Sequence, residues 1–84
     1  MSEIDWSRLR SLTARELIAA LIRDGFSLRH RAGSHRRYRH PDGRRVTVSC
    51  HRQSDIFRPK TLRSMIQDQA RWSDDDLRRL KILK

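Results

Sequence analysis

The pattern of apolar residues changes its period at Gly25, and this change constrains the fold more than any other feature of the sequence. Before Gly25, apolar residues recur at the spacing of one helix face: Leu17, Ile18, Leu21 and Ile22. After it, apolar and polar residues alternate, as they do along a half-buried β-strand. Glycine commonly ends a helix because it tolerates the left-handed backbone conformation found there. The sequence therefore predicts a helix followed by a sheet.

The first helix is predicted over residues 14–24. Thr13 and Glu16 have the spacing of a capping box, in which the hydroxyl and the carboxylate accept hydrogen bonds from free backbone N–H groups. Upstream, spaced apolar residues indicate a short arm, on which Trp6 is expected to cover one end of the core.

Three strands are predicted after Gly25. The first begins with Phe26 and Leu28 on its apolar face, and the others cover residues 35–40 and 45–50. The sequences Gly33-Ser34 and Pro41-Asp42-Gly43 supply the turns between them. The strands are expected to form an antiparallel meander.

Alternation also assigns the two faces of the second strand. Tyr38 and the aliphatic stem of Arg36 are expected on the apolar face. The solvated face then receives His35, Arg37 and Arg39.

Two further helices are predicted. One starts at Pro59, runs to about residue 70 with Leu62, Met65 and Ile66 on its apolar side, and packs beside the first helix. Ser73 opens a third, short helix whose three following acids face the positive end of the helix dipole and are not interpreted as metal ligands. The predicted fold class is α+β, an α-β-β-β-α arrangement in which a three-stranded antiparallel sheet carries two helices on one face, plus a short C-terminal helix.

Length and cysteine content limit the organisation of the chain. The 84 residues are expected to form a single domain over 1–84, with a core at about 12–70 and a helical extension at about 73–83. One cysteine, Cys50, excludes an internal disulfide framework and favours a cytoplasmic location. No segment is long and apolar enough to cross a membrane, so no membrane association is expected.

The charge balance indicates a polyanionic partner. The chain carries 20 basic and 10 acidic residues, and only Lys60, Lys81 and Lys84 among the basic ones are lysine. Arginine favours bidentate contacts with phosphate. Between residues 26 and 54 the only acid is Asp42. A basic surface that is merely solvated is the alternative interpretation.

Within this arginine-rich segment, His35 is the candidate catalytic residue. An imidazole can transfer protons near neutral pH, and guanidiniums can hold a phosphodiester. RNA carries its own nucleophile, the 2′-hydroxyl, so such a surface could cleave it without a metal or other cofactor. The predicted phosphate-binding residues are Arg29, Arg31, Arg36, Arg37, Arg39 and Arg45. A histidine that only contacts phosphate is the competing interpretation.

Other residues receive smaller roles. Ser34 and His51 are candidate assistants of His35, although Ser34 is also explained as a turn residue. His30, His35 and His40 recur at a spacing that does not converge as metal ligands do, and the pair Cys50-His51 lacks a second ligand pair. No metal site is predicted.

The order of these motifs resembles the HicA toxin family. The resemblance spans about Leu12 to Ala70 and rests on Leu17-Ile18, Gly25-Phe26, Arg31-Ala32-Gly33-Ser34-His35, Pro41-Asp42-Gly43, Val46-Thr47-Val48, His51 and Thr61-Leu62 with Ile66. It implies a double-stranded-RNA-binding-like fold and the activity of an mRNA interferase, the endoribonuclease toxin of a type II toxin–antitoxin system. By the same resemblance His35 matches the catalytic histidine, mRNA is the substrate, and a HicB-like antitoxin is the protein partner.

Two alternatives belong to other functional classes. One is a noncatalytic RNA-binding module of the same fold, in which His35 only makes contacts. The other is a DNA-binding protein whose helices around Thr61 and Asp74 form a helix-turn-helix. The junction at residues 69–72 lacks a turn glycine, and the acids of the third helix would repel phosphates, which disfavours DNA binding.

Overall fold

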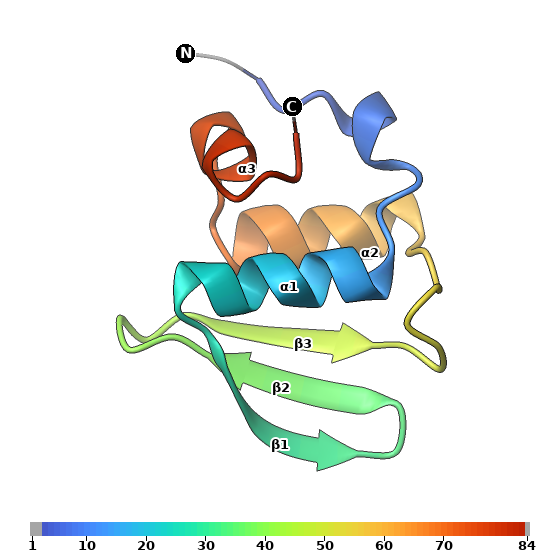
Figure 1. Cartoon of the computed structure of the whole chain (residues 1–84), viewed down its shortest axis with the longest axis vertical. Helices are drawn as coiled ribbons and strands as arrows, with labels where there is room; N and C mark the ends of the chain where they lie inside the picture. The colour runs from blue at the N-terminus through green and yellow to red at the C-terminus, as the bar shows by residue number, and fades with distance from the viewer. Residues whose placement is uncertain (1–2, 84) are drawn as a thin grey trace.

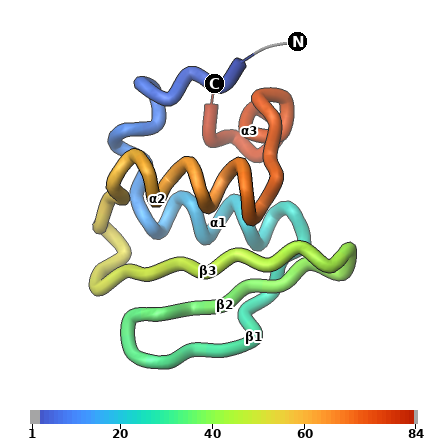
Figure 2. Tube along the Cα trace, turned by 180° about the vertical axis from the view of Figure 1, so that it is seen from behind, coloured from blue at the N-terminus to red at the C-terminus, as the bar shows by residue number. Residues whose placement is uncertain are grey.

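The computed structural model describes residues 3–83. Its elements follow in the order η1 (Trp6–Leu9), α1 (Ala14–Asp24), β1 (Ser27–Ala32), β2 (His35–Arg39), β3 (Arg45–Ser49), α2 (Pro59–Arg63), η2 (Ser64–Gln69) and α3 (Asp74–Arg79). Figure 1 shows the sheet on one side of a layer formed by α1 and the second helix, with α3 and the N-terminal segment on the other side. Figure 2 shows the same layers from behind. The predicted α-β-β-β-α fold with an added C-terminal helix is confirmed.

Helix α1 begins and ends at the predicted residues. Thr13 Oγ1 accepts a hydrogen bond from the Glu16 N–H at 3.2 Å, and Glu16 Oε1 accepts one from the Thr13 N–H at 3.1 Å. Gly25 ends the helix with φ of 105°, and a Cβ at this position would lie 3.0 Å from Nε2 of His40. Both the backbone conformation and the close approach of His40 therefore require glycine.

The sheet is the predicted antiparallel meander, in the order β1-β2-β3. The predicted faces of β2 and β3 are confirmed, because Tyr38, Val46 and Val48 are buried while the residues between them are exposed. These side chains join one hydrophobic cluster whose largest fully buried members are Leu9, Leu17, Leu21, Met65, Ile66, Leu77, Leu80, Val46 and Val48.

Strand β1 departs from simple alternation. Leu28 pairs with Tyr38 and the next pair joins His30 to Arg37, so Arg29 is the extra residue of a β-bulge. Leu28 shares the apolar face of Tyr38, as expected, but is 47% exposed. The reason is its position on the edge strand, which lies farthest from the helices (Figure 1).

The second helix starts at Pro59 as predicted but changes its winding at Ser64. From there to Gln69 it is a π-helix, and the Ala70 N–H donates to the Met65 carbonyl five residues earlier, at 2.8 Å. Gln69 Oε1 accepts a hydrogen bond from the Thr47 N–H at 2.8 Å. This bond satisfies a backbone donor on the side of β3 that faces away from β2, and so covers part of one sheet edge.

Helix α3 packs on the helical layer. Ser73 caps it through a reciprocal pair of hydrogen bonds with Asp76, and Asp74 forms an ion pair with Arg78 at 3.0 Å. The predicted apolar stripe is buried: Leu77, Leu80 and Leu83. None of the helices within residues 3–83 is long and apolar enough to span a bilayer.

The N-terminal arm contributes to the core through Leu9, which is 1% exposed, and Leu12. It contains the short helix η1, which was not predicted. Trp6 is half-buried against the core cluster, and the guanidinium of Arg63 lies 5.2 Å from the centre of its ring.

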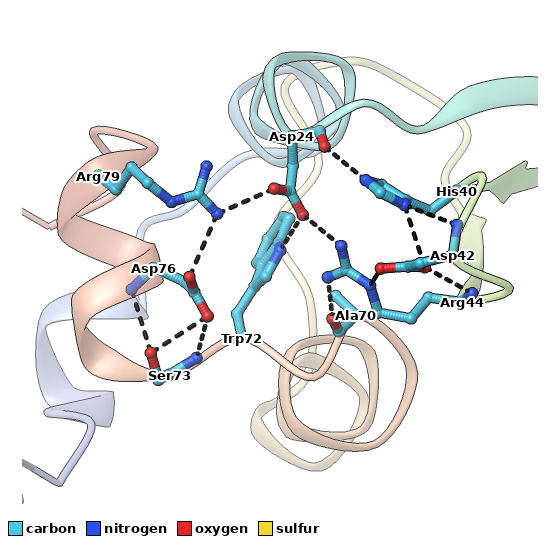
Figure 3. Close-up of polar contacts among 9 residues, drawn as sticks. All are labelled: Asp24, His40, Asp42, Arg44, Ala70, Trp72, Ser73, Asp76 and Arg79. Atoms are coloured by element: carbon cyan, nitrogen blue, oxygen red, sulfur yellow. Dashed lines mark hydrogen bonds and ion pairs between the residues drawn. The ribbon is translucent and has the colours of Figure 1, made fainter.

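The carboxylate of Asp24, at the end of α1, contacts side chains from three other segments (Figure 3). Oδ2 accepts a hydrogen bond from Nε1 of Trp72 at 2.8 Å and forms an ion pair with Arg44 at 3.1 Å. Oδ1 pairs with Arg79 at 2.9 Å. A negative charge at a helix C-terminus is unfavourable by itself, so these cations offset both the dipole and the burial of the carboxylate.

Arg44 extends this arrangement, which we call the Asp24 cluster: Asp24, His40, Asp42, Arg44, Trp72 and Arg79. Its guanidinium also contacts Asp42 at 2.7 Å and the Ala70 carbonyl at 2.6 Å, and lies 5.0 Å from the centre of the Phe26 ring. Nε2 of His40 lies 2.7 Å from the carbonyl oxygen of Asp24. The turn between β2 and β3 is thereby held against the ends of both central helices.

Burial of the Asp24 carboxyl raises its pKa, but hydrogen bonds from Trp72 and Arg79, together with the charges of Arg44 and Arg79, lower it further than burial raises it. The net result is a pKa below the ordinary value of 3.8. The charged form therefore stabilises the folded protein, and this contribution is complete above the unfolded-state pKa and lost as pH falls through the folded-state pKa.

Asp24→Asn should lower the free energy of unfolding at pH 7 by about 1–3 kcal/mol, because Arg44 and Arg79 lose their shared anion. Urea denaturation at pH 7 and in acid measures the effect. The difference from the wild type should shrink in acid, where the wild-type carboxyl is also neutral. Asp68→Asn is the control, since Asp68 is exposed and its side chain forms no hydrogen bond or ion pair within residues 3–83. An equal loss at both pH values would contradict this role of the Asp24 charge.

Candidate nucleic-acid interface

The sheet has one face against the helices and one face that we call the outer face. In an antiparallel pair, residues directly opposite each other project to the same side. Because Tyr38 projects toward the helices, its neighbours in β2 project outward, together with their partners in β1 and β3. The outer face therefore carries Ser27, His30, Ala32, His35, Arg37, Arg39, Arg45, Thr47 and Ser49.

His35 lies at the start of β2, directly after the two-residue turn Gly33-Ser34. Gly33 has φ of 59°, which fits the first position of a tight hairpin turn. The Ser34 carbonyl accepts a hydrogen bond from the Cys50 N–H at 3.0 Å, which anchors the turn to the end of β3. The His35 side chain is exposed and forms no hydrogen bond or ion pair with any residue of the described chain. Both ring nitrogens are therefore accessible to a ligand.

The outer face also contains a shallow hollow of about 470 Å³. Its wall includes four arginines, one histidine and one threonine: Arg29, Arg37, Arg39, Arg45, His30 and Thr47. Within residues 3–83, none of these guanidiniums forms an ion pair or a side-chain hydrogen bond. Among the described residues, no acidic side chain lines the hollow, so its field favours an anion.

The predicted phosphate-binding residues divide between the two faces. Four line the hollow: Arg29, Arg37, Arg39 and Arg45. Arg31 and Arg36 are paired with each other and project toward the helix side, where Tyr38 also lies. The bulge at Arg29 is the reason for the position of Arg31, because one extra residue reverses the faces of all later residues in the strand.

The same bulge brings His30 to the outer face, opposite Arg37. The sequence pattern gave His30 no role beyond a rejected one as metal ligand, and its place in the hollow was not predicted. The sequence pattern could not place His30 there, because plain alternation from Leu28 would have turned the His30 side chain toward the helices.

Ser34 and His51 lie near the same end of the sheet as His35. Ser34 belongs to the turn, and His51 follows directly after Cys50, which bonds to that turn. The backbone N–H groups of His51 and Arg52 donate to Oδ2 of Asp55 at 2.8 and 3.0 Å, and these bonds lower the pKa of the Asp55 carboxyl. They order the loop that carries His51, whose side chain is exposed.

Two residues of the arginine-rich segment are structural. Arg44 is 17% exposed and belongs to the Asp24 cluster. His40 packs edge-on against Phe26, with 5.1 Å between the ring centres. In the part of the chain that the structure describes, no three His, Cys, Asp or Glu side chains converge as metal ligands would.

The helices proposed for the DNA-binding alternative serve the core. The turn between them forms without glycine, because Arg71 adopts a φ of 57°. The absence of glycine was therefore not a valid argument against a turn. Asp74 and Asp76 form ion pairs within α3, and Trp72 is buried between the two helices and Asp24.

A comparison with protein families matches residues 14–71 to the HicA toxin of bacterial toxin–antitoxin systems. A comparison with curated proteins returned no match. The matched region begins at α1, includes the whole sheet and the second helix, and leaves the N-terminal arm and α3 outside. It contains His35 and every arginine of the outer face, and on this match the chain belongs to the HicA toxin family of bacterial toxin–antitoxin systems.

Proposed function

We propose that this toxin is a metal-independent endoribonuclease, an mRNA interferase, that cleaves RNA on the outer face of its sheet. The observation that carries the proposal is an exposed imidazole, His35, without a protein partner in residues 3–83, on the same face as an arginine-lined hollow. The family of the chain supports a toxin role, and RNA cleavage is the activity that this geometry serves best.

In the proposed reaction, the 2′-oxygen attacks the adjacent phosphorus while the bond from phosphorus to the 5′-oxygen breaks. The products are a 2′,3′-cyclic phosphate and a free 5′-hydroxyl. One group must take the 2′-proton and another must supply a proton to the leaving 5′-oxygen. His35 performs one of these transfers. His51 is the proposed second group, and Ser34 orients the RNA through its hydroxyl.

Arg37 is the proposed stabiliser of the charge that develops on the phosphate. It lies on the outer face two residues from His35, which corresponds to about 7 Å along a strand. Within residues 3–83 the Arg37 guanidinium forms no ion pair, so no ion pair has to break when it binds phosphate. Preformed charge of this kind stabilises a transition state without reorganisation of the protein.

The noncatalytic alternative uses the same face. In that case His35 and the arginines bind RNA but transfer no proton, and only a cleavage assay separates the two functions. DNA is a poor substrate for the proposed chemistry because it lacks the 2′-hydroxyl.

An antitoxin partner follows from the family, and we propose a HicB-like protein with an acidic surface that acts with the toxin in the cytoplasm. The unpaired arginines of the outer face supply the complementary charge. Such a partner would cover His35 and compete with RNA for the same cations.

His35→Ala should reduce cleavage of single-stranded RNA by about 10²–10⁴-fold, the usual contribution of a general acid or base. The assay is run with purified protein in excess EDTA and is accompanied by an RNA-binding titration and circular dichroism. Binding and fold should persist in the variant. A requirement for a divalent metal, or full activity of the variant, would disprove the proposed mechanism.

Arg37→Gln and Arg36→Gln remove the same charge from opposite faces of β2. RNA affinity is measured at several salt concentrations, and the logarithm of affinity is plotted against the logarithm of salt concentration. The slope should be smaller in magnitude by about 0.7 for Arg37→Gln, since one phosphate contact is lost. Arg36→Gln should change the slope less. Equal slopes for both variants would place the RNA away from the outer face.

Co-expression of the antitoxin should restore growth, and hydrogen exchange on the purified complex should show protection across residues 29–45. The physical reason is that an acidic partner excludes solvent from the arginines that it binds. A complex that leaves His35 unprotected and still cleaves RNA would show that inhibition works in another way.

A further inference from the structure

Arg39 and Arg45 face each other directly across β2 and β3. Residues in this relation have Cβ atoms about 5 Å apart, and like charges there destabilise a sheet. Neither guanidinium is compensated by an acid within residues 3–83. Asp42, the nearest acid in sequence, contacts Arg44 and His40 instead.

The surroundings of this pair add to the repulsion. Arg29 and Arg37 line the same hollow, and His30 lies on its β1 side. The sheet thus concentrates four guanidiniums around a hollow of about 470 Å³, which no carboxylate of residues 3–83 lines. An anion seated between Arg39 and Arg45 would convert their repulsion into a two-sided contact.

We propose that the Arg39–Arg45 pair is a phosphate subsite separate from the place where RNA is cut. The inference rests on the proposed function, because it treats the second anion as another phosphate of the same RNA strand. Arg39 is four residues from His35 along β2, or about 14 Å. This separation exceeds that between neighbouring phosphates, so one nucleotide cannot occupy both positions.

The proposal defines the substrate class more closely. The RNA strand runs along β2, with the scissile phosphate beside His35 and a later phosphate at the Arg39–Arg45 pair. Affinity should therefore increase sharply once an oligonucleotide is long enough to reach from one position to the other. The increase comes from the second contact being made within the same complex.

A thermal-unfolding experiment tests the pair without any reaction. In buffer without polyvalent anions, Arg45→Gln should raise Tm by a few degrees, because it removes the like-charge contact. With pyrophosphate added as the probe, the wild type should gain more in Tm than the variant, because the wild type binds the anion more tightly. Arg15→Gln, a change on the exposed surface of α1, is the matched control, and pyrophosphate should raise its Tm as much as that of the wild type. The proposal fails if pyrophosphate stabilises Arg45→Gln as much as the wild type.

A second experiment uses RNA oligonucleotides of increasing length and the His35→Ala protein, which prevents cleavage. Combining Arg39→Gln with Arg45→Gln should abolish the increase in affinity with length and reduce the salt slope for the long oligonucleotide by roughly 1.4. The control combines Arg15→Gln with Arg58→Gln, which removes the same charge from exposed positions outside the hollow. This variant should keep both the increase in affinity with length and the salt slope of the wild type.

The two failures are distinguishable. If the wild type cleaves no RNA but the length dependence and its loss are observed, the proposed catalysis is wrong and the subsite stands. If the wild type cleaves RNA but the double variant keeps the length dependence, the subsite is wrong and the proposed function stands.

Discussion

The carboxylate of Asp24 is shared by Arg44, Trp72 and Arg79, all of which lie far from Asp24 in the sequence. Without them, this charge would stand at the negative end of α1 in a largely buried position. Arg44 also contacts the turn between β2 and β3 and the end of the second helix. Through Arg44, this one shared anion links the turn between β2 and β3 to the ends of both central helices.

Within residues 3–83, ion pairs elsewhere in the molecule leave the outer face without acidic partners. Acids that could have neutralised the sheet form ion pairs elsewhere: Asp24 and Asp42 with Arg44, and Asp74 and Asp76 with arginines of α3. The excess of ten positive charges is therefore not spread evenly. Four of these charges line one hollow of the sheet, where a polyanion can supply counter-charge.

Features set by local chemistry could be predicted from the sequence. The capping box and Gly25 determine both ends of α1 because they satisfy or release backbone groups at those residues. The faces of β2 and β3 follow from strict alternation, which their regular pairing preserves. Hence the exposure of His35 and Arg37 was predictable. Their roles in binding and catalysis remain predictions.

Features set by tertiary contacts could not be predicted. The π-helix has the same apolar residues as an α-helix, and its Gln69 side chain finds its partner only when β3 lies alongside. Arg44 has the same local sequence character as its exposed neighbours and is distinguished only by the buried Asp24. The bulge at Arg29 leaves no mark in the composition of β1, yet it exchanges the faces of His30 and Arg31.

That bulge makes the register of β1 a determinant of its chemistry. If Arg29 instead took a regular place opposite Arg37, the strand would return to plain alternation, which would turn the His30 imidazole inward and bring the Arg31 guanidinium out with no change in sequence. The same six residues of β1 thus present different cations on the outer face according to whether Arg29 is bulged or paired. Which cations the first strand contributes to the outer face is therefore decided by its register as well as by the identity of its residues.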